Sequence, residues 1–173
     1  MKALALALTL ALASCGYQPV HGGAGAAPLS VVLSESKVPD AVASDEVLAG
    51  LREELARSGA LASGAAYPRC EVEILRMDEA AEGIAAAPGE GGRLVPRARA
   101  TRVGIVARAW VLEAPGADRT RDTGDVRAFE SVALATDARG AAFQHSDALR
   151  AAGRRLGRRL ASRIMGLPSP SDE

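Results

Sequence analysis

One cysteine near the N-terminus stands in a context that could direct covalent chemistry. Residues 12–15 read Leu12-Ala13-Ser14-Cys15, and an apolar run preceded by Lys2 leads up to them. This run has the length of a signal-peptide core and is too short to span a bilayer. The small residues suit a signal peptidase, and a leucine three positions before a cysteine is typical of a bacterial lipobox. We therefore expect cleavage before Cys15 and its acylation; a secretory signal with a coincidental cysteine is the alternative.

Acylation of Cys15 would attach the chain to a membrane through lipid. Each buried methylene contributes about 0.8 kcal/mol, so one acyl chain binds marginally, whereas the three chains of a mature bacterial lipoprotein anchor it essentially permanently. Gly16 follows the cysteine, whereas an aspartate there favours retention in the inner membrane of enterobacteria. We therefore predict a protein that is exported through the inner membrane and held in the outer membrane by its N-terminal acyl chains.

The rest of the chain offers little that could catalyse a reaction or bind a metal. It contains two histidines, His21 and His145, one further cysteine, Cys70, and no carboxylate pair in a recognisable motif. Because each histidine stands alone, we interpret His21 as a solvated side chain and His145 as a residue at the start of a helix, not as catalytic residues. The glycines of residues 88–92 do not precede a helix, so they do not form a nucleotide-binding motif. We expect no enzyme activity, no cofactor and no metal site. Cys70 is either buried or available for an intermolecular disulfide, and burial is favoured.

The charges of the chain balance, with 21 Lys and Arg against 21 Asp and Glu. No global field therefore draws the protein to nucleic acid, and any electrostatic function must be local. The length supports one domain. We divide the chain into a signal peptide (1–14), an acylated cysteine with a flexible tether (15–28), a single domain (29–167) and a disordered tail (168–173).

Hydrophobic periodicity predicts four strands and two helices in the domain. Strands are expected at residues 29–36, 67–77, 101–113 and 125–134. Helices are expected at residues 45–58, capped by Ser44, and 147–165, capped by Ser146. The order β-α-β-β-β-α indicates an α+β fold: a four-stranded, mostly antiparallel sheet with both helices packed on one face. Residues 78–100 are predicted to be a long Gly/Pro-rich loop.

Two groups of arginines are candidate binding residues. If the helices cover one face of the sheet, the period of two leaves an arginine and aromatic set on the other face: Arg102, Arg108, Trp110, Arg127 and Phe129. Such an exposed mixture suits a partner interface or an amphiphilic ligand, unless termini or loops cover it. The loop of residues 78–100 supplies the second group: Arg93, Arg97 and Arg99.

The last predicted helix is also rich in arginine. The arc beside its leucine stripe carries Arg150, Arg154, Arg155, Arg158 and Arg159. A basic amphipathic helix can bind anionic membranes. This helix needs its leucine stripe for the core and has no Trp or Phe at the boundary of its basic arc, so we favour a solvated face.

The combination of an acylated Cys15, Gly16-Tyr17 directly after it, a tether and a β-α-β-β-β-α domain resembles the LPS-assembly lipoprotein (LptE) family. The resemblance covers nearly the whole mature chain. It implies an outer-membrane lipoprotein that sits inside the β-barrel of the LPS-assembly protein LptD, helps it assemble and binds lipopolysaccharide during insertion into the outer leaflet. The glycine-rich connection at residues 78–100 departs from the family pattern, so no loop contact is assigned.

A second interpretation is a periplasm-facing auxiliary lipoprotein of an ABC-type lipid transport system. Such a protein also presents a small α/β domain on a lipid anchor. Gly16-Tyr17 and the β-α opening favour the first interpretation.

Overall fold

The computed structural model describes residues 27–133 and 137–168. The predicted signal peptide, Cys15, most of the tether and residues 169–173 of the tail lie outside this part of the chain. The elements are β1 (Ser30–Ser36), α2 (Ala41–Arg57), β2 (Arg69–Pro88), η1 (Glu90–Gly92), β3 (Leu94–Leu112), β4 (Val126–Ala133) and α3 (Ala138–Ile164).

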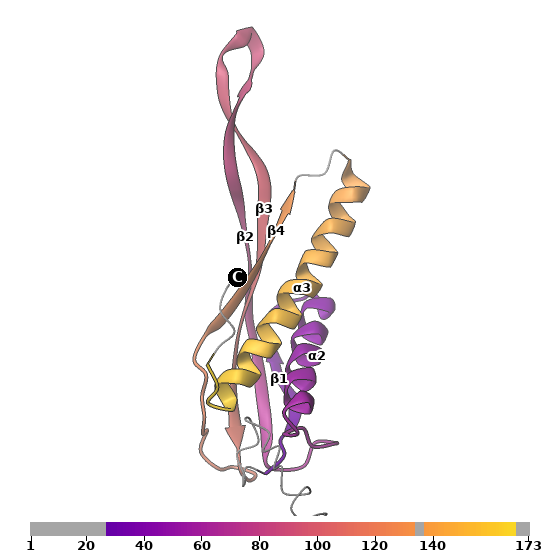
Figure 1. Ribbon diagram of the computed structural model, residues 1–173, viewed down its shortest axis with the longest axis vertical. Helices are drawn as coiled ribbons and strands as arrows, with labels where there is room; N and C mark the ends of the chain where they lie inside the picture. Colours follow the sequence, from indigo (N-terminus) through magenta and orange to yellow (C-terminus); the bar gives the residue numbers. More distant parts are fainter. Residues whose placement is uncertain (1–26, 134–136, 169–173) are drawn as a thin grey trace, which may run out of the picture.

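The four strands form one sheet in the order β1-β2-β3-β4. β1 is parallel to β2, and the other two neighbouring pairs are antiparallel. Both helices lie on the same side of the sheet (Figure 1). The predicted α+β fold class is therefore confirmed.

The core lies between the helices and the sheet. Leu51 and Leu156 from the helices are completely buried, as are Ile74 and Ile105 from the sheet. The two helix backbones approach so closely that a Cβ on Gly157 would lie 2.2 Å from the carbonyl oxygen of Val47. Glycine is required at this contact because any side chain would push the helices apart.

Both helices begin earlier than predicted. Asp40 caps α2, where its carboxylate accepts a hydrogen bond from the backbone N–H of Ala43 (3.1 Å). Asp137 caps α3 in the same way, through the N–H of Gly140 (2.8 Å). The predicted caps Ser44 and Ser146 were wrong because an aspartate satisfies the same free N–H groups at an earlier position.

The predicted loop at residues 78–100 is wrong: it is a β-hairpin that projects beyond the helices (Figure 1). The pairing of β2 with β3 continues to Pro88 and Leu94. Only residues 89–93 turn, and there Gly91 and Gly92 adopt positive φ angles of 77° and 75°, which favour glycine. The many alanines have low strand propensity, but pairing between the two strands supplies their backbone hydrogen bonds.

A β-bulge between Ile74 and Arg76 changes which residues of β2 face the helices. Before the bulge, Cys70, Val72 and Ile74 belong to the core. One extra residue then shifts the alternation, so that Met77 and Glu79 pair with the core-facing Ile105 and Val103. The bulge therefore turns Glu79 towards the helix side of the sheet.

Candidate functional site

The five predicted arginine and aromatic residues lie on the sheet face away from the helices. Neighbouring residues on β3, such as Val103, Ile105 and Val111, belong to the core on the opposite face. On β4, Val126 and Ala128 are in the core, so Arg127 and Phe129 point the other way. The structure divides the five residues into a covered group at one end of this face and an accessible group further along.

Trp110 belongs to the covered group, and the prediction that it is exposed is wrong. Its exposed fraction is 2%. The guanidinium of Arg119 lies over the indole ring, 3.8 Å from its centroid. Arg119 is brought there because Thr120 pairs with Val111 through two backbone hydrogen bonds of 2.7 and 2.8 Å. The loop at residues 113–125 therefore covers this end of the face, which was the alternative considered from the sequence.

Arg108 is held in an ion-pair network beside Trp110. The Lys37 Nζ atom lies 2.6 Å from Glu73 Oε1, and Arg108 Nε lies 3.5 Å from both Glu73 Oε2 and Asp125 Oδ1. The hydrogen bond from Lys37 lowers the pKa of Glu73, and Glu73 in turn raises the pKa of Lys37. The ionised pair is thus the stable state at neutral pH, and Arg108 is a structural rather than a free cation.

The accessible group consists of Arg102, Arg127 and Phe129, which we call the arginine–phenylalanine cluster. The two guanidinium carbons lie 5.7 and 5.8 Å from the centroid of the Phe129 ring. The ring packs over Gly104, where a Cβ would lie 2.3 Å from its Cδ1 atom. Both arginines are exposed. An apolar ring between two guanidinium groups can bind an amphiphile that carries phosphates.

Arg102 also has a partner within the protein. It donates a hydrogen bond to Glu82, which accepts another from the Ser131 hydroxyl. These hydrogen bonds lower the pKa of Glu82, with that from Ser131 contributing most. Arg102 is therefore positioned by a carboxylate while its side chain stays 46% exposed.

The second predicted group, Arg93, Arg97 and Arg99, lies in the projecting hairpin instead of a loop. Arg93 is exposed beside the turn, and Arg97 and Arg99 belong to β3. Next to Arg93, Leu94 and Val95 are exposed large apolar residues, with exposed fractions of 64% and 42%. The tip of the hairpin therefore combines positive charge with apolar surface, and the alternation of arginine at positions 97 and 99 was a strand signal in the sequence.

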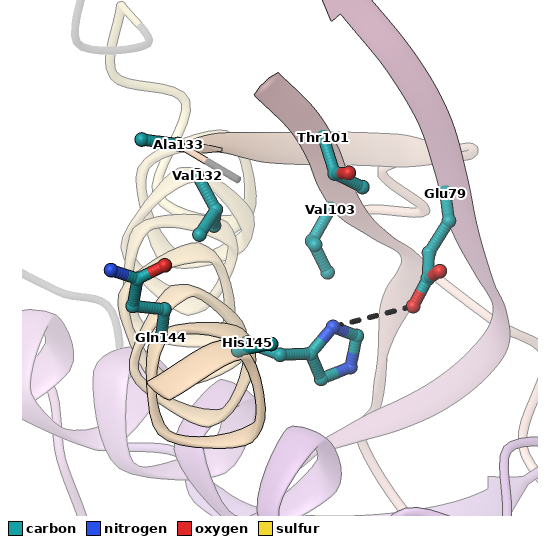
Figure 2. A pocket seen from close by; sticks show the side chains of 8 residues that line it. Glu79, Thr101, Val103, Val132, Ala133, Gln144 and His145 are labelled. Atoms are coloured by element: carbon teal, nitrogen blue, oxygen red, sulfur yellow. Dashed lines mark ion pairs between the residues drawn. The ribbon is translucent and has the colours of Figure 1, made fainter. Parts of the chain in front are cut away.

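A small crevice lies between the first turns of α3 and the sheet (Figure 2). It encloses about 150 Å³. Val103 and Val132 point into it from the sheet, and His145 lies at its rim with Nδ1 3.4 Å from Glu79 Oε1. His145 was predicted to start the last helix, but α3 begins at Ala138. The crevice was missed because the bulge that turns Glu79 towards it has no clear sequence signal.

Three arginines of α3 form a row along the outer edge of the sheet. Arg155 donates to the carbonyl oxygen of Phe129 (3.1 Å), Arg159 to that of Arg127 (2.9 Å) and Arg163 to that of Thr123 (3.1 Å). Burial lowers the pKa of Arg159. The prediction of a solvated face was wrong for Arg155 and Arg159, and their spacing of four residues was the signal for one row on the helix.

Cys70 is a buried free cysteine, and burial raises its pKa to about 12. Its thiol is therefore protonated and unreactive at neutral pH.

Residues 27–133 and 137–168 contain no group of three His, Cys, Asp or Glu residues that could hold a metal ion. None of the helices in this part of the chain has the length and apolar character needed to cross a membrane.

Comparison with known proteins found likeness only among solved structures. No family model and no curated protein matches the chain. The crystal structure of a protein from Caulobacter crescentus CB15 that is described as a lipoprotein has a TM-score of 0.52 at 11% identity. The match covers 78% of this chain and 88% of that protein's chain. A minor lipoprotein from Acinetobacter baumannii has a TM-score of 0.54 at 13% identity, covering 84% of this chain and 97% of its own. At these identities the likeness establishes a shared fold.

Proposed function

We propose that this protein is an outer-membrane lipoprotein without enzyme activity that partners the LptD β-barrel in the assembly and insertion of lipopolysaccharide. The projecting hairpin is the observation that carries the proposal. A two-stranded hairpin has no core of its own and is marginally stable in water. Its tip exposes Leu94 and Val95, and such an apolar tip on an anchored domain is best explained by insertion into a partner.

Three further observations support this function. The lipobox at residues 12–15 predicts an anchor of the kind that outer-membrane lipoproteins carry. The domain shares its fold with two proteins described as lipoproteins. The accessible arginines of the arginine–phenylalanine cluster suit the phosphates of lipopolysaccharide, and the ring of Phe129 suits its apolar part.

Affinity purification of the full-length acylated protein from membranes is expected to recover a large β-barrel. Replacing Leu94 and Val95 together by aspartate should reduce the recovered barrel by about tenfold or more, because buried charges at an interface are costly. Leu33→Asp is the matched control, since Leu33 is also exposed but lies on β1, away from the hairpin. Equal recovery of the barrel by all three proteins would reject the tip as the contact.

Lipopolysaccharide binding is expected to depend on the arginine–phenylalanine cluster. Arg102→Glu combined with Arg127→Glu should weaken binding at low salt, and rising ionic strength should weaken binding by the unsubstituted protein in the same direction. Arg150→Glu serves as the control because Arg150 is an exposed arginine on α3 whose ion-pair partner, Asp147, is also exposed. Binding that is insensitive to both the substitution and salt would exclude phosphate recognition at this cluster.

A further inference from the structure

Side chains and short segments occupy parts of the edges of the sheet. Arg155 and Arg159 occupy outward carbonyl groups of β4, and Thr120 pairs with the edge of β3. On β1, Arg52 donates to the carbonyl oxygen of Val31 (3.1 Å). Exposed strand edges are templates for pairing with another chain, and proteins usually block them. This sheet follows that rule around its base.

One edge of the hairpin has no such cover among the described residues. β1 ends where Ser36 pairs with Ile74, and the N–H of Lys37 makes the last bond to β2. Beyond this point the outer edge of residues 76–82 has no strand beside it among the described residues. Gly83, with a φ of 67°, ends the regular stretch. We call residues 76–82 the open edge; their number is that of an ordinary β-strand.

The hydrogen-bonding groups that the open edge offers follow from the register. Val111 exchanges both its backbone hydrogen bonds with Thr120, so the N–H and C=O groups of Val111 point away from β2. Alternation along residues 100–112 of β3 then places the even-numbered residues of this stretch towards β2. Through the register of the two strands, Met77, Glu79 and Ala81 direct their N–H and C=O groups outward. Asp78 and Ala80 are bonded to β3.

The opposite edge of the hairpin is less suited to pairing. On β3, residues 94–99 extend beyond the end of β4, where Ala133 pairs with Ala100. Near the turn the alternation is reversed: the N–H of Gly89 bonds to the carbonyl oxygen of Arg93 (2.8 Å), so odd-numbered residues of this stretch face β2 and the backbone of Pro96 faces outward. Proline has no N–H to donate and is a common means of blocking an edge strand. The edge of β2 is therefore the one that remains open.

The surroundings of the open edge indicate what would occupy it. Glu79 lies both on this edge and at the rim of the crevice lined by Val103 and Val132. A strand added beside Glu79 would direct alternate side chains towards the helix side, where the crevice lies. The open edge also carries one base, Arg76, against three acids: Asp78, Glu79 and Glu82. Arg76 pairs with Asp78 and Arg102 pairs with Glu82, so Glu79 leaves the edge with a net negative charge, which favours a basic segment.

We propose that a protein partner adds an extended segment, with apolar residues alternating with basic ones, as a fifth strand beside residues 76–82. Main-chain hydrogen bonds to Met77, Glu79 and Ala81 supply affinity, and the crevice selects the apolar side chains. The inference rests on the proposed function for the identity of the partner as a β-barrel protein. A closed barrel has no free strand edge, so the segment would come from one of its loops or termini.

Ala81→Pro tests this mode of binding in the full-length acylated protein. Proline removes one outward N–H and places its ring in the path of the added strand, whereas no bond to β3 is lost. Recovery of the partner should fall about tenfold or more, as expected for a lost hydrogen bond with a steric clash. Ala81→Val is the matched control because it adds similar bulk on an exposed residue and keeps the N–H; recovery should stay within about twofold of the unsubstituted protein.

Residue-resolved hydrogen exchange of the unsubstituted protein, free and in the purified complex, decides the question even if the proline variant fails to fold. The amides of Met77, Glu79 and Ala81 should exchange about tenfold or more slowly in the complex, while the amides of Asp78 and Ala80 are protected in both states. Unchanged exchange at the outward amides, full recovery with Ala81→Pro, or photocrosslinking from position 81 to a second copy of this chain would each overturn the proposal.

The outcomes also separate this inference from the proposed function. A β-barrel that is recovered equally with Ala81→Pro and Ala81→Val supports the function and rejects strand addition. A partner that is not a barrel, but is lost with Ala81→Pro and protects the outward amides, supports strand addition and rejects the function.

Discussion

Cells that express Cys15→Ala are expected to accumulate an uncleaved precursor that takes up no labelled palmitate. The lipobox cysteine supplies the thiol that is acylated, and cleavage of a lipoprotein precursor takes place before this residue. Without the acyl chains, attachment to the membrane through lipid is expected to be lost. Metabolic labelling followed by membrane fractionation measures both effects.

Cys70→Ala is the control for this experiment. Cys70 is buried and its pKa is raised to about 12, so its thiol is not expected to take up lipid. Labelling should therefore be unchanged in Cys70→Ala and absent in Cys15→Ala. If Cys15→Ala still takes up palmitate as the unsubstituted protein does, the chain has a different site of acylation; if neither protein is labelled, the chain has an ordinary secretory signal.

Trp110→Ala is expected to lower the free energy of unfolding by about 3–5 kcal/mol, the usual cost of truncating a buried tryptophan. The indole is almost completely buried beneath Arg119, and its removal leaves a cavity on a face that has no helix to close it. Urea unfolding followed by circular dichroism measures the loss. A cost below about 1 kcal/mol would mean that the ring is solvated, as surface substitutions are usually small.

Trp110→Phe separates packing from hydrogen bonding. The indole N–H is buried without a hydrogen-bond acceptor among the described residues, so phenylalanine would remove an unsatisfied donor while keeping an aromatic ring under Arg119. Its cost should therefore be clearly smaller than that of alanine. An equal loss of stability in both variants would indicate that the N–H has an acceptor.

The sequence predicted the four-stranded sheet and its two faces because the alternation of residues on β3 and β4 is regular. Val103, Ile105 and Val111 face the core, as their spacing indicated. The hairpin at residues 78–100 was missed for a physical reason: its strands have no core face, so no hydrophobic alternation marks them. Of the glycines that suggested a loop, Gly91 and Gly92 are needed at the turn, and Gly83 adopts a positive φ within β2.

The candidate site was less predictable because it depends on contacts between distant segments. Trp110 is covered only because Thr120 pairs with Val111 and carries Arg119 over the ring. Glu79 reaches His145 only because the bulge after Ile74 reverses the alternation of β2. Counting by twos from Ile74 places Glu79 on the opposite face, and no local propensity reveals where such a count fails.

The turn at residues 89–93 is closed by a hydrogen bond from the N–H of Gly89 to the carbonyl oxygen of Arg93 (2.8 Å). Its conformation therefore does not depend on the length of the strands that lead to it. Inserting two residues into each strand next to the turn would extend the hairpin by about 7 Å and keep every side chain on its original face. An insertion of one residue would reverse the faces above it. Among proteins of this fold, the reach of the hairpin can therefore change in steps of two residues per strand while the base stays constant.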